Sequence, residues 1–219
     1  MIKKLQKLKA KKGFTLVELI VVIAIIGVLA AILIPTMLGF VTSSRVTSAN
    51  TTASEIQKQI NQFLTDADTA GYGPLKGTAS TTITIDIGKT TAGTWEVAVG
   101  TPNSFKTGNT IAWTAAGTGK AGDTKAGVTN ATQLLAINLA DLFPSLTNGA
   151  VSAMVIGGSC TAVWYTADAS DHATVSNVPA FGTTAQSPWS ATTYGWDGST
   201  AGITSDGYTV GTAPVVPLG

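Results

Sequence analysis

An acidic residue, Glu18, lies inside an apolar run near the start of the chain, the stretch FTLVELIVVIAIIGVLAAILIPTML over residues 14–38. The only other polar residues of this run are Thr15 and Thr36. A carboxylate in such a helix is costly without a partner, and the partner must be a cation or a hydrogen-bond donor. The next basic residue along the helix is Arg45, about seven turns away. We therefore expect the partner of Glu18 to come from outside its own helix.

Other residues that could do chemistry form no recognisable site. The only histidine, His172, excludes a two-histidine metal site, and with no nucleophile identified its neighbour Asp171 is expected to share a solvated turn with it. Residues 117–122, GTGKAG, satisfy G-x-G-x-x-G, but no apolar helix follows them. Residues 66–71 begin like a calcium loop whose twelfth position is glycine instead of an acid. We expect no catalytic residue, metal or cofactor, and a protein that is not an enzyme; the single Cys160 is expected to be a buried small hydrophobe.

The charges of the chain are unevenly placed. Its 219 residues carry a net charge of +1, but six of the 13 basic residues precede Gly13. These six are Lys3, Lys4, Lys7, Lys9, Lys11 and Lys12. The remainder holds 7 basic against 12 acidic side chains, a balance of −5. One cysteine excludes an internal disulfide, and the Thr/Ser/Gly/Ala-rich remainder is typical of a surface protein.

The lysines and the apolar run together predict a membrane-inserted segment. The run exceeds the roughly 20 helical residues that cross a bilayer, and the positive-inside rule places the N-terminus in the cytoplasm. An uncleaved signal anchor and a secretory signal peptide are the simplest alternatives. The run is too long for a secretory signal, with no clear cleavage site after it. Neither alternative gives Glu18 a partner.

Cleavage after Gly13 would supply that partner. It would free the α-amino group of Phe14 and remove the six leader lysines. The new amine lies about one helical turn from Glu18 of the same chain. In a stack of subunits, the amine of a neighbour could pair with Glu18 without unwinding either helix. Cleavage would therefore convert an anchored precursor into a chain that assembles.

The run GFTLVE, after a short lysine-rich leader and before a long apolar helix, resembles the N-terminus of type IV pilins and related pseudopilins. The resemblance covers about residues 7–65. It implies that a prepilin peptidase cuts between Gly13 and Phe14 and methylates the Phe14 amine, and that Glu18 promotes polymerisation. The apolar helices would form the core of a fibre.

Two further positions of the apolar helix match the family. Gly27 and Pro35 fall where assembled pilins can lose helical structure. Proline lacks an N–H and clashes with the carbonyl four residues back, while glycine costs about 1 kcal/mol of helix propensity. Small residues three or four apart, Ala24, Gly27, Ala30 and Ala31, allow close helix approach. A merely kinked membrane helix is the alternative.

The fold class that we expect is α+β, with a long N-terminal helix packed on a mainly antiparallel β-sheet head. Residues 1–13 form the leader, 14–70 the helix and 71–219 the head. An apolar stripe extends the helix beyond the membrane run: Val46, Ala49, Ala53, Ile56, Ile60, Phe63 and Leu64. Gln57, Lys58, Asn61 and Gln62 would occupy its other face.

The head reads mainly as strands. Two hairpins are predicted, the first pairing 82–87 with 95–99 and the second pairing 150–156 with 161–166 around Gly157-Gly158. Other predicted elements are a weak strand over 110–113, a loop over 117–127, and a helix over 130–143 that ends before Pro144. After Ala167 the chain is expected to be turn-rich.

Aromatic residues gather in the C-terminal tail, at Trp189, Tyr194, Trp196 and Tyr208. Aromatic faces in loops can stack on sugars, so Trp189, Tyr194 and Trp196 are candidates for contact with a carbohydrate or another surface ligand. The bland alternative is that these rings pin the loops to a sheet. Nucleic-acid binding has little support, because the processed chain is acidic and has no basic cluster with interleaved aromatics.

The head is also polarised in charge along the sequence. Residues 71–130 hold Lys76, Lys89, Lys106, Lys120 and Lys125, whereas residues 131–219 hold five aspartates and no lysine or arginine. We hypothesise that the lysine-bearing segment of one subunit faces the aspartate-bearing segment of the next. Two ordinary solvated surfaces are the alternative.

The resemblance implies a structural subunit that polymerises into a type IV pilus, a surface filament for adhesion, motility or DNA uptake. Its partners would be other copies of itself, the prepilin peptidase and the assembly platform in the membrane. The precursor would lie in the inner or cytoplasmic membrane and the mature chain in an extracellular filament. Two alternatives stay open: a membrane-anchored extracellular binding protein, and a pseudopilin of a secretion or competence system.

Overall fold

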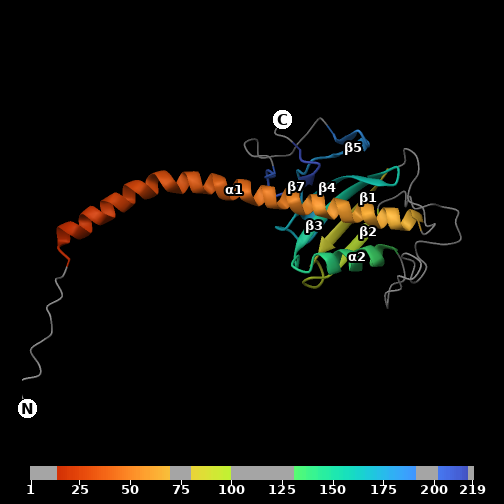
Figure 1. Ribbon diagram of the computed structural model, residues 1–219, viewed down its shortest axis with the longest axis horizontal. Coiled ribbons are helices and arrows are strands. Elements are labelled where there is room, and N and C mark those ends of the chain that lie inside the picture. Colours follow the sequence, from red (N-terminus) through yellow and green to blue (C-terminus); the bar gives the residue numbers. More distant parts are fainter. Residues whose placement is uncertain (1–13, 70–79, 100–130, 191–201, 217–219) are drawn as a thin grey trace, which may run out of the picture. The chain divides into compact units, whose positions relative to one another are not determined.

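The computed structural model describes residues 14–69, 80–99, 131–190 and 202–216 of the chain. The chain divides into two compact units, one up to Ser43 and one from Ser44 onward. Helix α1 (Leu16–Thr69) contributes to both units (Figure 1). It ends within a residue of the predicted boundary.

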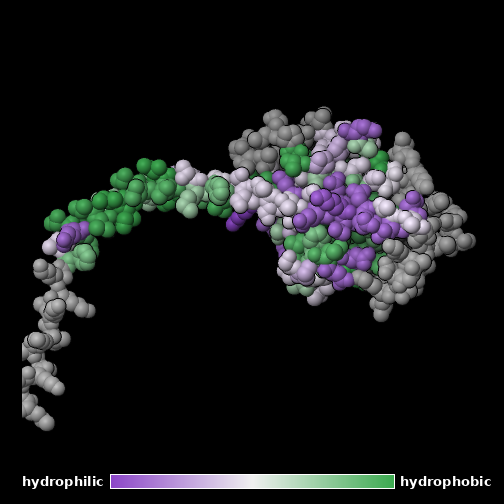
Figure 2. Space-filling view, viewed as in Figure 1, coloured by the Kyte–Doolittle hydropathy of each residue, from purple (hydrophilic) through white to green (hydrophobic). Residues whose placement is uncertain are grey.

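The first unit is the apolar part of α1. Its large hydrophobic side chains, from Phe14 to Val41, are 45–85% exposed, and Figure 2 shows them as a nearly continuous hydrophobic surface. By length and composition the helix can cross a membrane. It continues unbroken through Gly27 and Pro35. The hydroxyl of Thr36 donates to the carbonyl of Leu33 at 2.9 Å in this region.

The second unit begins with the amphipathic part of α1. Its buried side chains recur every three or four residues, as the sequence predicts: Ala49, Ala53, Ile56, Ile60 and Leu64. None of the five is more than 8% exposed. Val46 and Phe63, also assigned to this stripe, are half-buried. One continuous face of the helix therefore enters the core of the head.

The head contains a five-stranded antiparallel sheet in the order β2-β1-β3-β4-β7. Its strands are β1 (Ser80–Ile87), β2 (Trp95–Val99), β3 (Gly149–Ile156), β4 (Ser159–Thr166) and β7 (Gly211–Ala213). Both predicted hairpins are confirmed as β1–β2 and β3–β4. The long pairing of β1 with β3 joins the two hairpins, with Ile85 opposite Val151.

Each face of the sheet is covered by an apolar cluster. On one face, Ile83, Ile85, Val151 and Val163 belong to the same cluster as the α1 stripe and as Leu135 and Leu139 of helix α2 (Ala131–Leu142). Helix α2 confirms the helix predicted over 130–143. On the other face, the buried cluster consists of Ala150, Ala162, Trp164, Ala169, Val175, Trp189, Val210 and Val216.

The region after Ala167 contains strands that the sequence does not reveal. A small second sheet pairs β5 (Phe181–Thr184) with β6 (Ser187–Trp189), and β7 completes the edge of the main sheet. These strands are only three or four residues long and show no clear alternation. The described part of this region is turn-rich as expected, but it also contains short strands that the sequence does not predict. The strand predicted over 110–113 and the loop predicted over 117–127 lie outside the described residues.

Two polar residues of α1 face the sheet instead of solvent, which corrects the predicted polar face. The Asn61 side chain accepts from the Cys160 N–H at 2.8 Å and donates to the Cys160 carbonyl at 3.1 Å. Gln57 donates to the same carbonyl at 3.2 Å. The pairing register of β3 and β4 shifts at this point, between Met154 and Val155. Side-chain amides of α1 thus satisfy backbone groups at the irregularity.

Strand β7 approaches α1 closely enough to require glycine. A Cβ atom at Gly211 would lie 2.0 Å from the carbonyl carbon of Ala49 and 2.1 Å from its oxygen. Next to it, the Thr212 N–H donates to the Asn50 side chain at 2.7 Å. Backbone and helix therefore meet with no room for a side chain between them.

This contact predicts the effect of adding one methyl group. We expect Gly211→Ala to lower the free energy of unfolding by about 3 kcal/mol or more, because backbone must shift to admit it. Denaturant unfolding followed by tryptophan fluorescence measures the change. Gly207→Ala is the control, since its methyl meets open space and only the positive φ of 84° opposes it, at about 1 kcal/mol. Equal losses in the two variants would contradict the proposed close approach.

Candidate functional site

The start of α1 is closed by Thr15 and Glu18. The Thr15 N–H and hydroxyl each donate to Glu18 Oε2 at 2.8 Å, and the Glu18 N–H donates back to the Thr15 hydroxyl at 3.2 Å. The Thr15 carbonyl accepts from the Leu19 N–H, the first bond of the helix. This reciprocal arrangement is a capping box, which satisfies backbone N–H groups that have no partner within the helix.

The capping box corrects the expectation that Glu18 has no partner within its own helix. Its donors come from Thr15, and the T-x-x-E spacing of residues 15–18 is the sequence signal for them. Both bonds, however, go to Oε2, and no described residue donates to Oε1. No basic side chain within the described ranges pairs with this carboxylate. One oxygen therefore closes the helix, while the other can accept a further donor.

The remaining predicted residues of this segment lie beside the box or farther along the helix. Gly13 lies outside the described residues, and Phe14 is 85% exposed. Gly27 and Pro35 lie within the unbroken helix. At Gly27 no atom lies within 4 Å of where a Cβ would be, so the backbone there is open to close approach. Phe14 and Gly27 are thus open to contacts from outside the chain.

A second cluster of ionisable groups forms where β1 meets the turn η1 (His172–Thr174). Asp86 Oδ1 accepts from the His172 backbone N–H at 2.8 Å and lies 2.6 Å from its ring Nδ1. Lys89 Nζ lies 3.0 Å from Asp86 and 3.1 Å from Asp171. The side chains of Asp171 and His172 are only 27% and 30% exposed. They form a turn at the surface with no buried residue, as expected, but their side chains also pair with Lys89 and Asp86.

The electrostatics of this cluster follow from its hydrogen bonds. Burial raises the pKa of Asp86, but hydrogen bonds from His172 and Lys89 outweigh it and lower the pKa below its usual value. Hydrogen bonds to Asp86 and Asp171 raise the pKa of Lys89. Asp86, Asp171 and His172 present metal-ligand atoms within 4.8 Å of one another, but the Lys89 ammonium already bridges the two carboxylates. The arrangement is therefore a structural ion cluster.

Lys89 bears on the hypothesis of charge steering between subunits. This lysine is paired with Asp86 and Asp171 of its own chain, although its side chain stays 38% exposed. Lys76, Lys106, Lys120 and Lys125 lie outside the described residues. The hypothesis stays a prediction.

The aromatic residues of the tail divide into buried and undescribed positions. Trp189 is 8% exposed, stacks on Phe181 with ring centroids 5.3 Å apart, and donates its indole N–H to the Pro214 carbonyl at 2.8 Å. Its faces are thus unavailable for ligand contact, which corrects its candidate role. Tyr194 and Trp196 lie outside the described residues. Cys160 is buried as expected, and burial raises the pKa of its thiol.

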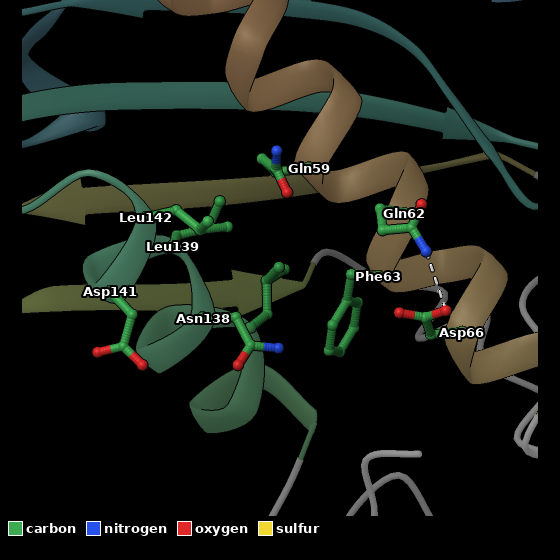
Figure 3. Close-up of a pocket in the computed structure, with 9 residues that line it drawn as sticks. Gln59, Gln62, Phe63, Asp66, Asn138, Leu139, Asp141 and Leu142 are labelled. Carbon is green, nitrogen blue, oxygen red and sulfur yellow. Dashed lines mark hydrogen bonds between the residues drawn. The ribbon is translucent and has the colours of Figure 1, made fainter. Parts of the chain in front are cut away.

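A hollow of about 320 Å³ lies between α1 and α2 (Figure 3). Phe63 and Leu139 line it, together with polar groups such as Gln59 and Asn138. On its α1 side, the Gln62 amide donates to Asp66 at 3.0 Å. The lining holds the carboxylates of Asp66 and Asp141 but no serine, cysteine, histidine or lysine, so it does not present a nucleophile beside a base.

A long helix with an apolar first part, whose second part packs on an antiparallel sheet, defines the pilin-like α+β class. Residues 8–34 match the family model described as the prokaryotic N-terminal methylation motif. The chain is 36% identical to a type IV major fimbrial protein, FimA, of Dichelobacter nodosus over 91 residues, 42% of this chain and 56% of the relative.

Two other relatives extend the likeness. A fimbrial protein of Moraxella nonliquefaciens is 40% identical over 73 residues, 30% of this chain and 47% of that protein. A fimbrial protein of Pseudomonas aeruginosa is 48% identical over 50 residues, 23% of this chain and 32% of that protein. The chain thus spans about half or less of these curated relatives. No solved structure gives a significant match. The resemblance to type IV pilins is confirmed.

The ion cluster predicts a pH-dependent contribution to stability. Asp86→Asn should lower the free energy of unfolding near neutral pH by about 1–3 kcal/mol, because buried donors lose a charged acceptor. Since the folded pKa of Asp86 is lowered, its contribution is present above about pH 4 and is lost as the pH falls through the folded pKa. Denaturant unfolding of wild type and variant between pH 2 and pH 7 measures the gap, which should narrow in acid.

The matched control for this measurement is Glu96→Gln. Glu96 lies directly opposite Asp86 on β2, but it is more exposed and its hydrogen bond to Thr90 is local. It should change stability by no more than about 0.5 kcal/mol. If Asp86→Asn has no larger effect than Glu96→Gln, the cluster does not stabilise the head.

Proposed function

We propose that this chain is the precursor of a type IV pilus subunit. It is cut between Gly13 and Phe14, methylated on the Phe14 amine, and polymerises with other copies of itself into a surface filament. Glu18 carries this proposal. The fimbrial relatives and the methylation motif support it, and the unused carboxylate oxygen supplies a physical reason for assembly.

The geometry at Glu18 suits a contact between chains. Its Oε2 is engaged by Thr15, so Oε1 can accept a cationic N–H from the Phe14 amine of a neighbour without breaking the helix cap. A charged pair surrounded by apolar side chains interacts more strongly than one in water, because the effective dielectric constant is lower. Before cleavage the Phe14 nitrogen belongs to a neutral peptide bond. Cleavage therefore creates the charge that assembly uses.

The exposed apolar part of α1 supports the same proposal. Its side chains from Phe14 to Val41 need an apolar environment, first in lipid and then against the helices of neighbours. The open backbone at Gly27 permits close helix approach, and Pro35 removes a hydrogen bond from the same region. We infer that this section yields first when a fibre is stretched.

Location and partners follow from this assignment. The leader lysines hold the N-terminus of the precursor in the cytoplasm, and the head lies outside the membrane. The prepilin peptidase and a membrane assembly platform would act on the chain before it joins the filament. The chain would have a structural and not a catalytic role. Contact with a carbohydrate or another surface ligand is proposed only for Tyr194 and Trp196.

The processing step gives a direct prediction. Protein sheared from the cell surface should begin at Phe14, and its intact mass should match the chain without residues 1–13 plus one N-methyl group. Intact-mass and N-terminal analysis measures both. An intact leader would contradict the proposal and favour a membrane-anchored binding protein.

Two variants separate the role of Glu18 in filament assembly from its role as a helix cap. Glu18→Gln keeps a capping-box acceptor but removes the charge, so filaments should be lost while the membrane-inserted precursor persists. Thr15→Ala removes the cap but keeps the carboxylate, so filaments should still form, at reduced yield. Electron microscopy of filaments and immunoblots of membranes report the two outcomes. Normal filaments from Glu18→Gln would show that charge pairing does not drive assembly.

A further inference from the structure

A second hollow, of about 410 Å³, lies in the head between the start of its α1 segment and the end of β4. Arg45, Ser48 and Thr52 line it from the helix, at spacings that place them on one helix face. Tyr165 and Asp168 line it from the end of β4 and the loop that follows. A positive side chain, a negative side chain and several hydroxyl-bearing residues therefore line one open hollow.

Tyr165 is the residue that makes this hollow more than a surface depression. It is only 3% exposed, and no described residue forms a hydrogen bond with its hydroxyl. At an open hollow such a hydroxyl meets water, which a ligand oxygen can replace, and buried polar groups in proteins are seldom left without an acceptor. Burial and the nearby Asp168 carboxylate raise the pKa of Tyr165, so its hydroxyl keeps its proton. The group is thus a donor in need of an acceptor.

The two charged residues of the lining, Arg45 and Asp168, limit the kind of ligand that the hollow can bind. Asp168 Oδ2 accepts the Thr209 N–H at 2.8 Å, while its other oxygen accepts no hydrogen bond from a described residue. Arg45 forms no ion pair within the described parts of the chain. An anionic ligand would be repelled by Asp168 and a cationic one by Arg45. A neutral ligand whose groups both donate and accept can satisfy each of them.

We propose that this hollow binds a neutral saccharide unit. Sugar hydroxyls can accept from Arg45 and Tyr165 and donate to Asp168, and the Ser48 and Thr52 hydroxyls add adaptable contacts. A peptide fits less well, because peptide grooves rely on apolar anchors and Leu146 is the only large aliphatic residue of this lining. The site is distinct from the aromatic tail, and it does not depend on assembly into a filament.

The test uses the full chain in a phosphocholine detergent, because maltoside detergents carry sugars themselves. Saturation-transfer NMR with D-glucose, D-galactose and N-acetyl-D-glucosamine, each at millimolar concentration, should show transfer to at least one of them. Tyr165→Phe and Arg45→Gln should each weaken binding about five- to tenfold. The first variant loses a hydrogen bond from a neutral donor, and the second loses one from a charged donor. Tyr208→Phe is the control and should bind normally, since Tyr208 packs in the opposite cluster.

Folding of the key variant is checked independently. Tyr165→Phe removes an unpaired hydroxyl and keeps the ring, so its melting temperature without sugar should not fall. Absence of transfer from all three sugars would overturn the proposal, as would unchanged binding in both Tyr165→Phe and Arg45→Gln. A photo-crosslinker on Ser48→Cys that couples to a second copy in intact filaments, without sugar binding, would show that a neighbouring chain occupies the hollow instead.

Discussion

The head depends on one stripe of small and branched apolar side chains on α1. Ala53, Ile56 and Ile60 are fully buried against the sheet, and the small alanine lets the backbone of the helix come close to the strands. Ile83, Ile85 and Ile87 of β1 face the same cluster, because alternate residues of a strand point to the same side. Burying an aliphatic side chain contributes about 1.5–3 kcal/mol, so this stripe is a large part of what offsets the entropy of ordering the head.

Directional contacts turn that apolar packing into a single arrangement. Asn61 pairs with both backbone groups of Cys160, and Asn50 accepts from Thr212. An apolar stripe alone would tolerate sliding along the sheet, whereas these amides match particular backbone groups. On the opposite face, Asp86 joins β1 to the 172–174 turn in the same way. Buried or half-buried polar side chains of the head thus fix its register.

The sequence predicts the elements with strong periodicity and fails where contacts are set by tertiary structure. The helix stripe, both long hairpins and α2 follow from spacing and turn residues. Strand β7 could not be predicted, because Gly211 and its two neighbours carry no alternation and their contacts are with β4 and α1, far away in the sequence. At Glu18, the isolated carboxylate is evident from the sequence, and the T-x-x-E spacing of residues 15–18 is the local signal for its Thr15 donors. The pairing of Asp86 with His172, 86 residues away, has no local signal.

The contact of β7 with α1 also has a consequence for how the head is made. Asn50 and Thr212 are 162 residues apart, yet they share a hydrogen bond, and a Cβ at Gly202 would lie 2.4 Å from Val46. The first and last described segments of the head are therefore partners, which makes its closure a long-range event and a late one. Until β7 is in place, the part of α1 around Ala49 and Asn50 lacks the strand that contacts it in the folded head. Truncation near the C-terminus would therefore expose the α1 residues at the start of the head, even if strands β1 to β4 were complete.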